Sequence, residues 1–197
     1  MYRARLFVFA SLTLLLLCVT SFAQTPGPQF WRRLSCEPYE PRTKLESLEF
    51  SYDTVIVKGF TRITTIDVRG VRVDAVEMRE NNSQARVKGI VIALREGGDH
   101  LSDNRAFIDY DEIDSLVRAI DSLSRIDETV TKLAGFEARY LTHGEFEMNA
   151  FRQTNRGAAI TLTTGICDKP TQTLTLDEFA KFRALIVEAK MRLDEIR

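Results

Sequence analysis

The sequence predicts an α+β fold in which antiparallel sheet and two helices form a tandem repeat of several strands followed by one helix. Three observations support this: short β-branched and alternating apolar runs, two amphipathic helical stripes, and a similarity between the two halves of the chain. We expect residues 45–135 to form the first repeat and residues 136–197 the second, together making one compact domain.

The strand predictions start at Leu45 and rest on apolar periodicity. Residues 54–57 are a β-branched run, and Ile90, Ile92 and Leu94 alternate with their neighbours. The apolar parity changes after Ala75, which predicts a β-bulge there. Residues 97–104 are polar and glycine-rich, which predicts a loop. Further strands are expected over residues 60–68, 71–78, 86–96, 136–140, 145–150 and 160–163.

Two helices are expected, over residues 109–126 and 175–196. Each has an apolar stripe at helical spacing, which predicts that one face packs on the sheet. Asp109 with Glu112 and Thr175 with Glu178 have the spacing of capping boxes, in which the first side chain and the acid three residues later bond each other's backbone amides. Each pair therefore marks a helix start.

The two halves of the chain resemble each other. Residues 88–94 match residues 156–162, and residues 108–113 match residues 174–179, with a loop two residues shorter in the second half. Each half then reads as several strands, a polar loop, a short strand and a capped helix. This order indicates an internal duplication.

The run Phe107-Ile108-Asp109-Tyr110-Asp111-Glu112, with Phe136-Glu137-Ala138 and Ala180-Lys181-Phe182-Arg183, resembles a family of exported bacterial proteins without assigned activity. The likeness covers most of residues 45–197 and brings no catalytic residues to this chain. Four strands followed by one helix, used twice, also resembles the topology of the Whirly-type single-stranded-DNA-binding fold. Fold alone does not transfer that function, and a basic sheet face studded with aromatics is not expected here. The net charge of −1 likewise argues against nucleic acid as a partner.

Residues 1–23 have the order of a secretory signal peptide. Arg3 and Arg5 precede an apolar run over residues 6–19, which is short for a membrane span, and Ser21 and Ala23 provide a small-residue cleavage site. We expect cleavage after Ala23, a periplasmic or secreted protein, and no membrane span after cleavage; an uncleaved anchor is the alternative. Residues 24–44 hold four of the five prolines and predict an extended lead-in.

The mature chain keeps two cysteines, Cys36 and Cys167. An oxidising compartment would allow a disulfide between them. Two free or buried thiols are an equal alternative, because sequence alone does not determine pairing.

Motifs with known catalytic or cofactor-binding mechanics are missing, and the chain has two histidines. His100 lies in a polar stretch with Asp99 and Asp103, which makes these three residues weak candidates for a ligand loop. The spacing of a calcium loop is not met, so a solvated turn is the better interpretation. We expect no cofactor and no metal.

The acids Asp109, Asp111, Glu112 and Asp114 raise the alternative of a hydrolase whose site is built from dispersed carboxylates. Helix capping and dipole complementarity explain them better, because the second helix starts in the same way. The leading hypothesis is an exported, non-catalytic binding or structural module of the bacterial envelope, whose partner is an unknown protein or envelope component. A deep pocket on which Asp, Glu and His side chains converge would favour the enzyme, and a flat, exposed apolar sheet face would favour the binding module.

Overall fold

The computed structural model describes residues 40–68, 70–81, 85–95, 101–127, 129–133, 135–153, 157–165 and 169–196. The chain divides into two units, Met1–Glu37 and Pro38–Arg197, and every described residue belongs to the second. The elements follow in the order α2 (Lys44–Glu49), β1 (Ile56–Val68), β2 (Val71–Glu80), β3 (Arg86–Arg95), β4 (Leu101–Asp109), the 3-10 helix η2 (Tyr110–Glu112), α3 (Ile113–Leu123), β5 (Glu137–Leu141), β6 (Glu147–Gln153), β7 (Gly157–Thr163), β8 (Thr171–Leu174) and α4 (Leu176–Asp194).

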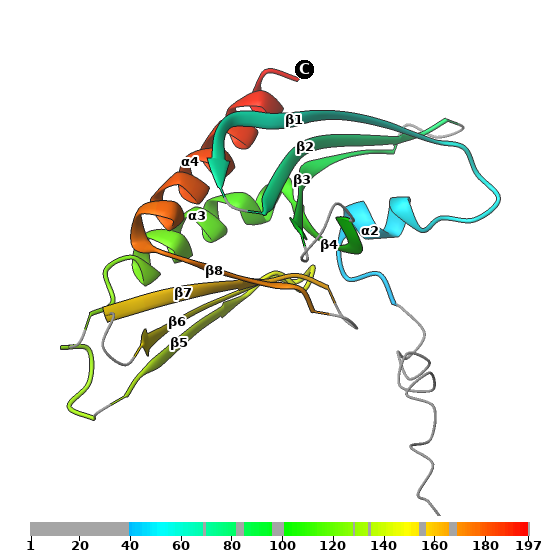
Figure 1. Cartoon of the computed structure of the whole chain (residues 1–197). Coiled ribbons are helices and arrows are strands. Elements are labelled where there is room, and N and C mark those ends of the chain that lie inside the picture. Colours follow the sequence, from blue (N-terminus) through cyan, green and yellow to red (C-terminus); the bar gives the residue numbers. More distant parts are fainter. Residues whose placement is uncertain are drawn as a thin grey trace, which may run out of the picture. The chain divides into compact units, whose positions relative to one another are not determined.

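The described strands form two four-stranded antiparallel sheets, termed the first sheet (β1–β4) and the second sheet (β5–β8) (Figure 1). Each strand pairs with the next one along the chain, so both sheets are simple meanders. Helix α3 follows the first sheet and α4 follows the second. The architecture is therefore α+β, and its order is consistent with tandem sheet-and-helix units.

One hydrophobic core joins both sheets to both helices. Ile92 of the first sheet, Met148 of the second, Leu116 of α3 and Phe182 of α4 all belong to it and are fully buried. Helix α4 contacts β1, β2 and β3 as well as β7 and β8. Helix α4, which follows the second sheet, therefore completes the core beneath the first sheet.

A smaller cluster covers the opposite face of the first sheet, where α2 packs. Its members are Leu45, Val76, Met78, Val91 and Phe107. The sequence predicts strands from Leu45 onward, and this is wrong at the start, because residues Lys44–Glu49 are helical. Thr43 and Glu46 form a complete capping box there, a local signal that the strand assignment overlooked.

The bulge predicted near Ala75 is also wrong. Strand β2 pairs with β3 without interruption, and the register shift lies in β1, between Ile63 and Val68. Ala75 faces the main core while the next residue, Val76, faces α2. The apolar parity changes because both faces of the strand are buried, which needs no extra residue.

Two predictions around β4 need correction. The polar loop predicted for residues 97–104 is wrong from Leu101 onward, because that residue already pairs with Arg95 of β3. Asp109 makes no capping bond to the helix that follows it. Its carboxylate instead accepts hydrogen bonds from the amides of Lys44, at 2.8 Å, and Leu45, at 3.0 Å, so it caps α2. The capping box predicted at the start of α4 is confirmed.

Candidate functional site

Most of the residues that the sequence singles out cannot be placed. Cys36, Cys167, Asp99 and His100 lie outside the described residues. Asp103 lies in β4, and its side chain is not among those described. The disulfide and the ligand loop therefore stay predictions.

The acidic run at the start of α3 is divided among several structural contacts. Hydrogen bonds and ion pairs join Asp111 to Lys44, Glu112 to the backbone and ring of His143, and Asp114 to Lys190. The hydrogen bond from Lys44 holds the pKa of Asp111 below its usual value. These acids fasten α2, the β5–β6 turn and α4 to one corner of the fold.

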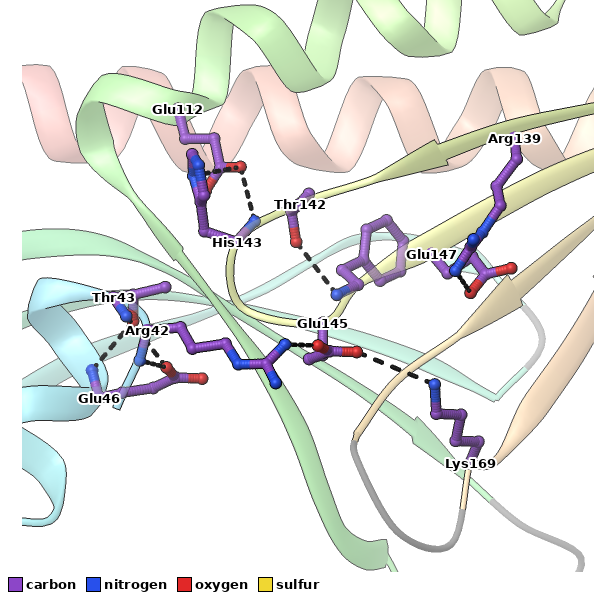
Figure 2. Close-up of polar contacts among 11 residues, drawn as sticks. Arg42, Thr43, Glu46, Glu112, Arg139, Thr142, His143, Glu145, Glu147 and Lys169 are labelled. Carbon is purple, nitrogen blue, oxygen red and sulfur yellow. Dashed lines mark hydrogen bonds and ion pairs between the residues drawn. The ribbon is translucent and has the colours of Figure 1, made fainter. Parts of the chain in front are cut away.

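The β5–β6 turn forms a second polar cluster, whose side chains are labelled in Figure 2. The Thr142 hydroxyl accepts a hydrogen bond from the Phe146 amide at 3.0 Å. Glu145 adopts a left-handed backbone conformation, with φ of 58°, and its carboxylate pairs with Arg42 and, at 3.8 Å, with Lys169. The ion pairs come from opposite sides of the turn, so this cluster holds the turn in place.

That turn closes one edge of the first sheet. A Cβ atom added to Gly144 would lie 1.9 Å from the carbonyl oxygen of Phe107, so the turn backbone packs directly on β4. At β8, the outermost strand of the second sheet, the Gln172 side chain donates to the carbonyl of Arg95 at 2.6 Å. The second sheet therefore contacts the first at β4, through the β5–β6 turn, and at the end of β3, through Gln172.

Strand β1 is the other outermost strand of the first sheet and pairs with β2 only (Figure 1). Strand β5 of the second sheet also pairs on one side only, with β6, but it spans five residues whereas β1 spans thirteen. No strand of the described part of the chain lies on the other side of β1. Its residues from Gly59 to Arg62 are all exposed, and Phe60 is 64% exposed. A long, open edge of this kind is a template for another strand.

The pairing shows which main-chain groups are free. The Asn81 amide donates to the Val55 carbonyl at 2.9 Å, and the register continues from that pair into β1. Because hydrogen-bonded and non-hydrogen-bonded pairs alternate in an antiparallel ladder, Lys58, Phe60 and Arg62 direct their amide and carbonyl groups away from β2. Three alternate residues therefore present a free edge.

The side chains of the same three residues lie on the α2 side of the sheet, opposite Met78, Val76 and Asp74. There they border a cavity of about 230 Å³, termed the basic hollow. Its lining residues are Lys58, Phe60, Arg62, Arg72, Asp74, Val76, Val91 and Arg105. Four cations from three strands therefore surround an apolar floor.

Two carboxylates serve these four cations. Asp74 lies 3.4 Å from the Nε atom of Arg62 and 3.1 Å from that of Arg72. Glu49 lies 2.8 Å from the Nζ atom of Lys58 and 3.3 Å from Arg105. Each carboxylate is shared by two cations, so the hollow keeps an excess of positive charge.

The other side of β1 borders a larger cavity of about 510 Å³, termed the β1–α4 groove. Its lining combines β1 residues such as Thr61 with Glu188, Arg192 and Ile196 of the α4 end of the chain. Glu77 also lines it. Burial raises the pKa of Glu77, but hydrogen bonds from Arg79 and Arg86 outweigh that effect and lower it. The groove thus has a mixed, ionised lining.

The sequence analysis missed this site for two reasons. Its cations are far apart in the sequence and meet only through strand pairing, and the near-neutral net charge hides a local excess. The expectation that no basic sheet face studded with aromatics is present stays a prediction, since Phe60 is the one aromatic among the residues that line the hollow. The alternation of Lys58, Phe60 and Arg62 was the available signal, since a strand places them on one face.

Comparison with protein-family models and with curated proteins finds no match to this chain. Within the described residues, no three His, Cys, Asp or Glu side chains are grouped so that they could hold a metal ion. None of the described helices is both long and apolar enough to cross a membrane.

Proposed function

We propose that this chain is an exported, non-catalytic binding module of the bacterial envelope, and that it binds an extended segment of a partner protein beside β1. The main support is the free edge at Lys58, Phe60 and Arg62, with a cavity on each side of the sheet. Peptides that add a strand to a sheet obtain affinity from main-chain hydrogen bonds and specificity from pockets for alternate side chains. The edge of β1 has both features.

Export is supported by the signal-like order of residues 1–23. Expression of the full chain in a Gram-negative host should give a periplasmic or secreted protein whose first residue is Gln24, as read by intact-mass measurement. Recovery of soluble protein that still begins at Met1 would contradict this part of the proposal.

The hydrolase alternative has weaker support. The acids that suggested it form ion pairs and capping bonds, such as Asp109 with α2 and Asp114 with Lys190. The carboxylates that line the β1–α4 groove are those of Glu77, Glu188 and Glu195, and each is paired with an arginine. A general acid or base must lie within hydrogen-bond reach of a substrate, whereas these three carboxylates already bind arginines of the same chain.

A selection experiment tests the edge. A phage-displayed heptapeptide library is selected on the mature protein and, in parallel, on Phe60→Pro. Proline removes the outward amide of residue 60, which β2 does not use, so an edge strand should tolerate it. We expect enrichment of alternating, β-branched sequences on the parent protein and none on the variant.

Phe60→Val is the matched control, because it removes the aromatic ring and keeps the amide. It should keep the enrichment of alternating sequences, with affinity reduced by the loss of the ring, and both variants should keep the thermal unfolding midpoint of the parent. Equal enrichment on the parent and on Phe60→Pro, or no enrichment on either, would overturn binding at this edge.

A further inference from the structure

The geometry at β1 further points to the kind of segment that binds: one with the pattern acidic–x–apolar–x–acidic, whose carboxylates lie opposite Lys58 and Arg62. This inference rests on the proposed strand addition and specifies its ligand. It follows from three properties of the edge: which side chains an added strand would face, the charge of the basic hollow, and the space on the other side.

An added strand would form hydrogen-bonded pairs with Lys58, Phe60 and Arg62, because these residues have the outward main-chain groups. Directly opposed side chains lie on the same face of a sheet, with Cβ atoms about 5 Å apart. The partner residues at positions i, i+2 and i+4 would therefore face the basic hollow. Those at i+1 and i+3 would face the β1–α4 groove.

The two outer positions face cations that are only partly neutralised. Arg62 shares Asp74 with Arg72, and Lys58 shares Glu49 with Arg105. Arg72 adds to this imbalance, because its buried Nε atom makes no hydrogen bond although Asp74 lies 3.1 Å away. The hollow can thus accept two further carboxylates, and these would form charge-assisted hydrogen bonds.

The central position faces Phe60, whose neighbours on the floor of the hollow are Val76 and Val91. Phe60 is 64% exposed and has its ring available for contact. An apolar residue opposite it would remove this surface from water. On the other side, Gly59 contributes no side chain, and a Cβ there would have its nearest neighbour 3.9 Å away, which leaves room for the partner's x residues.

A second copy of β1 fits this edge poorly. Antiparallel pairing centred on Phe60 would place Lys58 of one copy opposite Arg62 of the other, and like charges directly opposed are destabilising. Nucleic acid also fits less well than an acidic peptide, because Asp74 and Glu49 lie among the cations and Phe60, the one aromatic among the residues lining the hollow, gives little stacking surface. Both remain outcomes of the experiment.

The test uses a fluorescein-labelled heptapeptide, Thr-Glu-Thr-Val-Thr-Glu-Thr, titrated with the mature protein in an anisotropy assay. Its matched partners replace both glutamates by glutamine or by lysine. We expect the glutamate peptide to bind at least about tenfold more tightly than the lysine peptide, and its binding to weaken as salt is raised. A lysine peptide that binds as tightly would overturn the acidic pattern.

Two N-methylated peptides separate this inference from the proposed function. Methylation of the central valine amide blocks a hydrogen bond to β1. Methylation of the following threonine amide alters a group that points away from β1, so it should leave binding largely intact. Loss of binding in the first alone supports strand addition. If no peptide binds, or if the two methylated peptides bind alike, the proposed function fails; if methylation discriminates but charge does not, only the acidic pattern fails.

A charge exchange completes the test on the protein side. Arg62→Glu should lose affinity for the glutamate peptide and gain affinity for the lysine peptide, which a purely structural effect would not produce. Arg62→Gln is a second variant should Arg62→Glu lower the unfolding midpoint, because it places no carboxylate beside Asp74. It should reduce the preference for the glutamate peptide over the lysine peptide. A fluorescein-labelled oligothymidylate of similar length is titrated alongside, and tighter binding of it than of the glutamate peptide would overturn the inference in favour of nucleic acid.

Discussion

The first and second sheets share a strand order and a following helix, yet they differ in how many faces they bury. In β3 of the first sheet, every residue from Gly89 to Leu94 is buried. In β6 of the second sheet, Met148 and Ala150 are buried while Glu147 and Asn149 between them are partly exposed. The difference arises because α2 covers the outer face of the first sheet. Two similar sheet-and-helix repeats can thus differ in whether one or both faces of the sheet are buried, depending on the presence of one short helix.

The edges differ as well. The β5–β6 turn packs on β4 and the Gln172 side chain joins the sheets at β8, whereas the edge of β1 pairs with no described strand. Strand β1 spans thirteen residues from Ile56 to Val68, but the register shift beyond Ile63 limits its regular part. The charges of Lys58 and Arg62 further restrict what can pair there, as is common for exposed edges. The longer open edge, that of β1 rather than β5, therefore belongs to the sheet whose inner strand β3 is buried on both faces.

The prediction with the largest expected effect concerns the hydrophobic core that the two sheets share through α4. Phe182 is fully buried, with its ring centroid 5.7 Å from that of Phe146 and 6.2 Å from that of Phe179. Phe182→Asp would bury an unpaired carboxylate and should cost about 4 kcal/mol or more, enough to unfold the protein. Thermal unfolding followed by circular dichroism should show loss of both sheets together.

Lys181→Asp is the matched control, because it places the same carboxylate on the exposed side of α4. It should change the free energy of unfolding by no more than about 0.5 kcal/mol. A Phe182→Asp protein that retains a cooperative transition at the parent's midpoint would show that α4 does not complete a common core.

Local patterns predicted much of this fold from the sequence. The stripe and capping box of α4 and the alternation of Met148 and Ala150 depend on neighbours within a few residues, and the structure confirms them. The interpretation of Asp109 is wrong because its carboxylate caps a helix whose first residue, Lys44, lies sixty-five residues earlier in the chain. Such a contact depends on tertiary structure, which competes with local propensity.

The candidate site was less predictable still. Whether a strand is an edge depends on the order of all strands in the sheet, and β1 could have been central without any change in its own residues. The four cations of the basic hollow meet because β1, β2 and β4 lie at defined registers. The sequence shows that charged and aromatic residues alternate in β1, but it does not show which strands and helices lie beside them.

A second prediction compares two glycines of the first sheet, one central and one at the edge. A Cβ at Gly89 of β3 would lie 2.1 Å from the Ile108 carbonyl oxygen and 2.7 Å from the Leu45 side chain. Gly89→Ala should therefore destabilise by about 1–3 kcal/mol through overpacking between β4 and α2. Gly59→Ala should stay within about 0.5 kcal/mol of the parent. Urea unfolding measures both, and equal stabilities would mean that α2 does not cover the sheet.

The smallest expected effect concerns the polar contact between the two helices. Arg183 of α4 donates to Asp121 of α3, with Nε 2.6 Å from Oδ1. This hydrogen bond holds the pKa of Asp121 below its usual value. A carboxyl whose pKa is lowered by folding stabilises the fold above its unfolded pKa of about 3.9, and the stabilisation is lost as the pH falls through the lower folded value.

Asp121→Asn should therefore lower the unfolding midpoint slightly near neutral pH, and the difference from the parent should shrink as the solution becomes more acidic than the unfolded pKa. A double-mutant cycle with Arg183→Gln isolates the pair, because each single substitution also alters surface charge. The coupling between the two positions should be small, since both side chains are partly exposed, with 42% exposure for Arg183 and 35% for Asp121. A coupling that persists unchanged in acid would show that the contact between α3 and α4 does not depend on the ionised carboxylate. Helices α3 and α4 would then be held together by the apolar core and not by this ion pair.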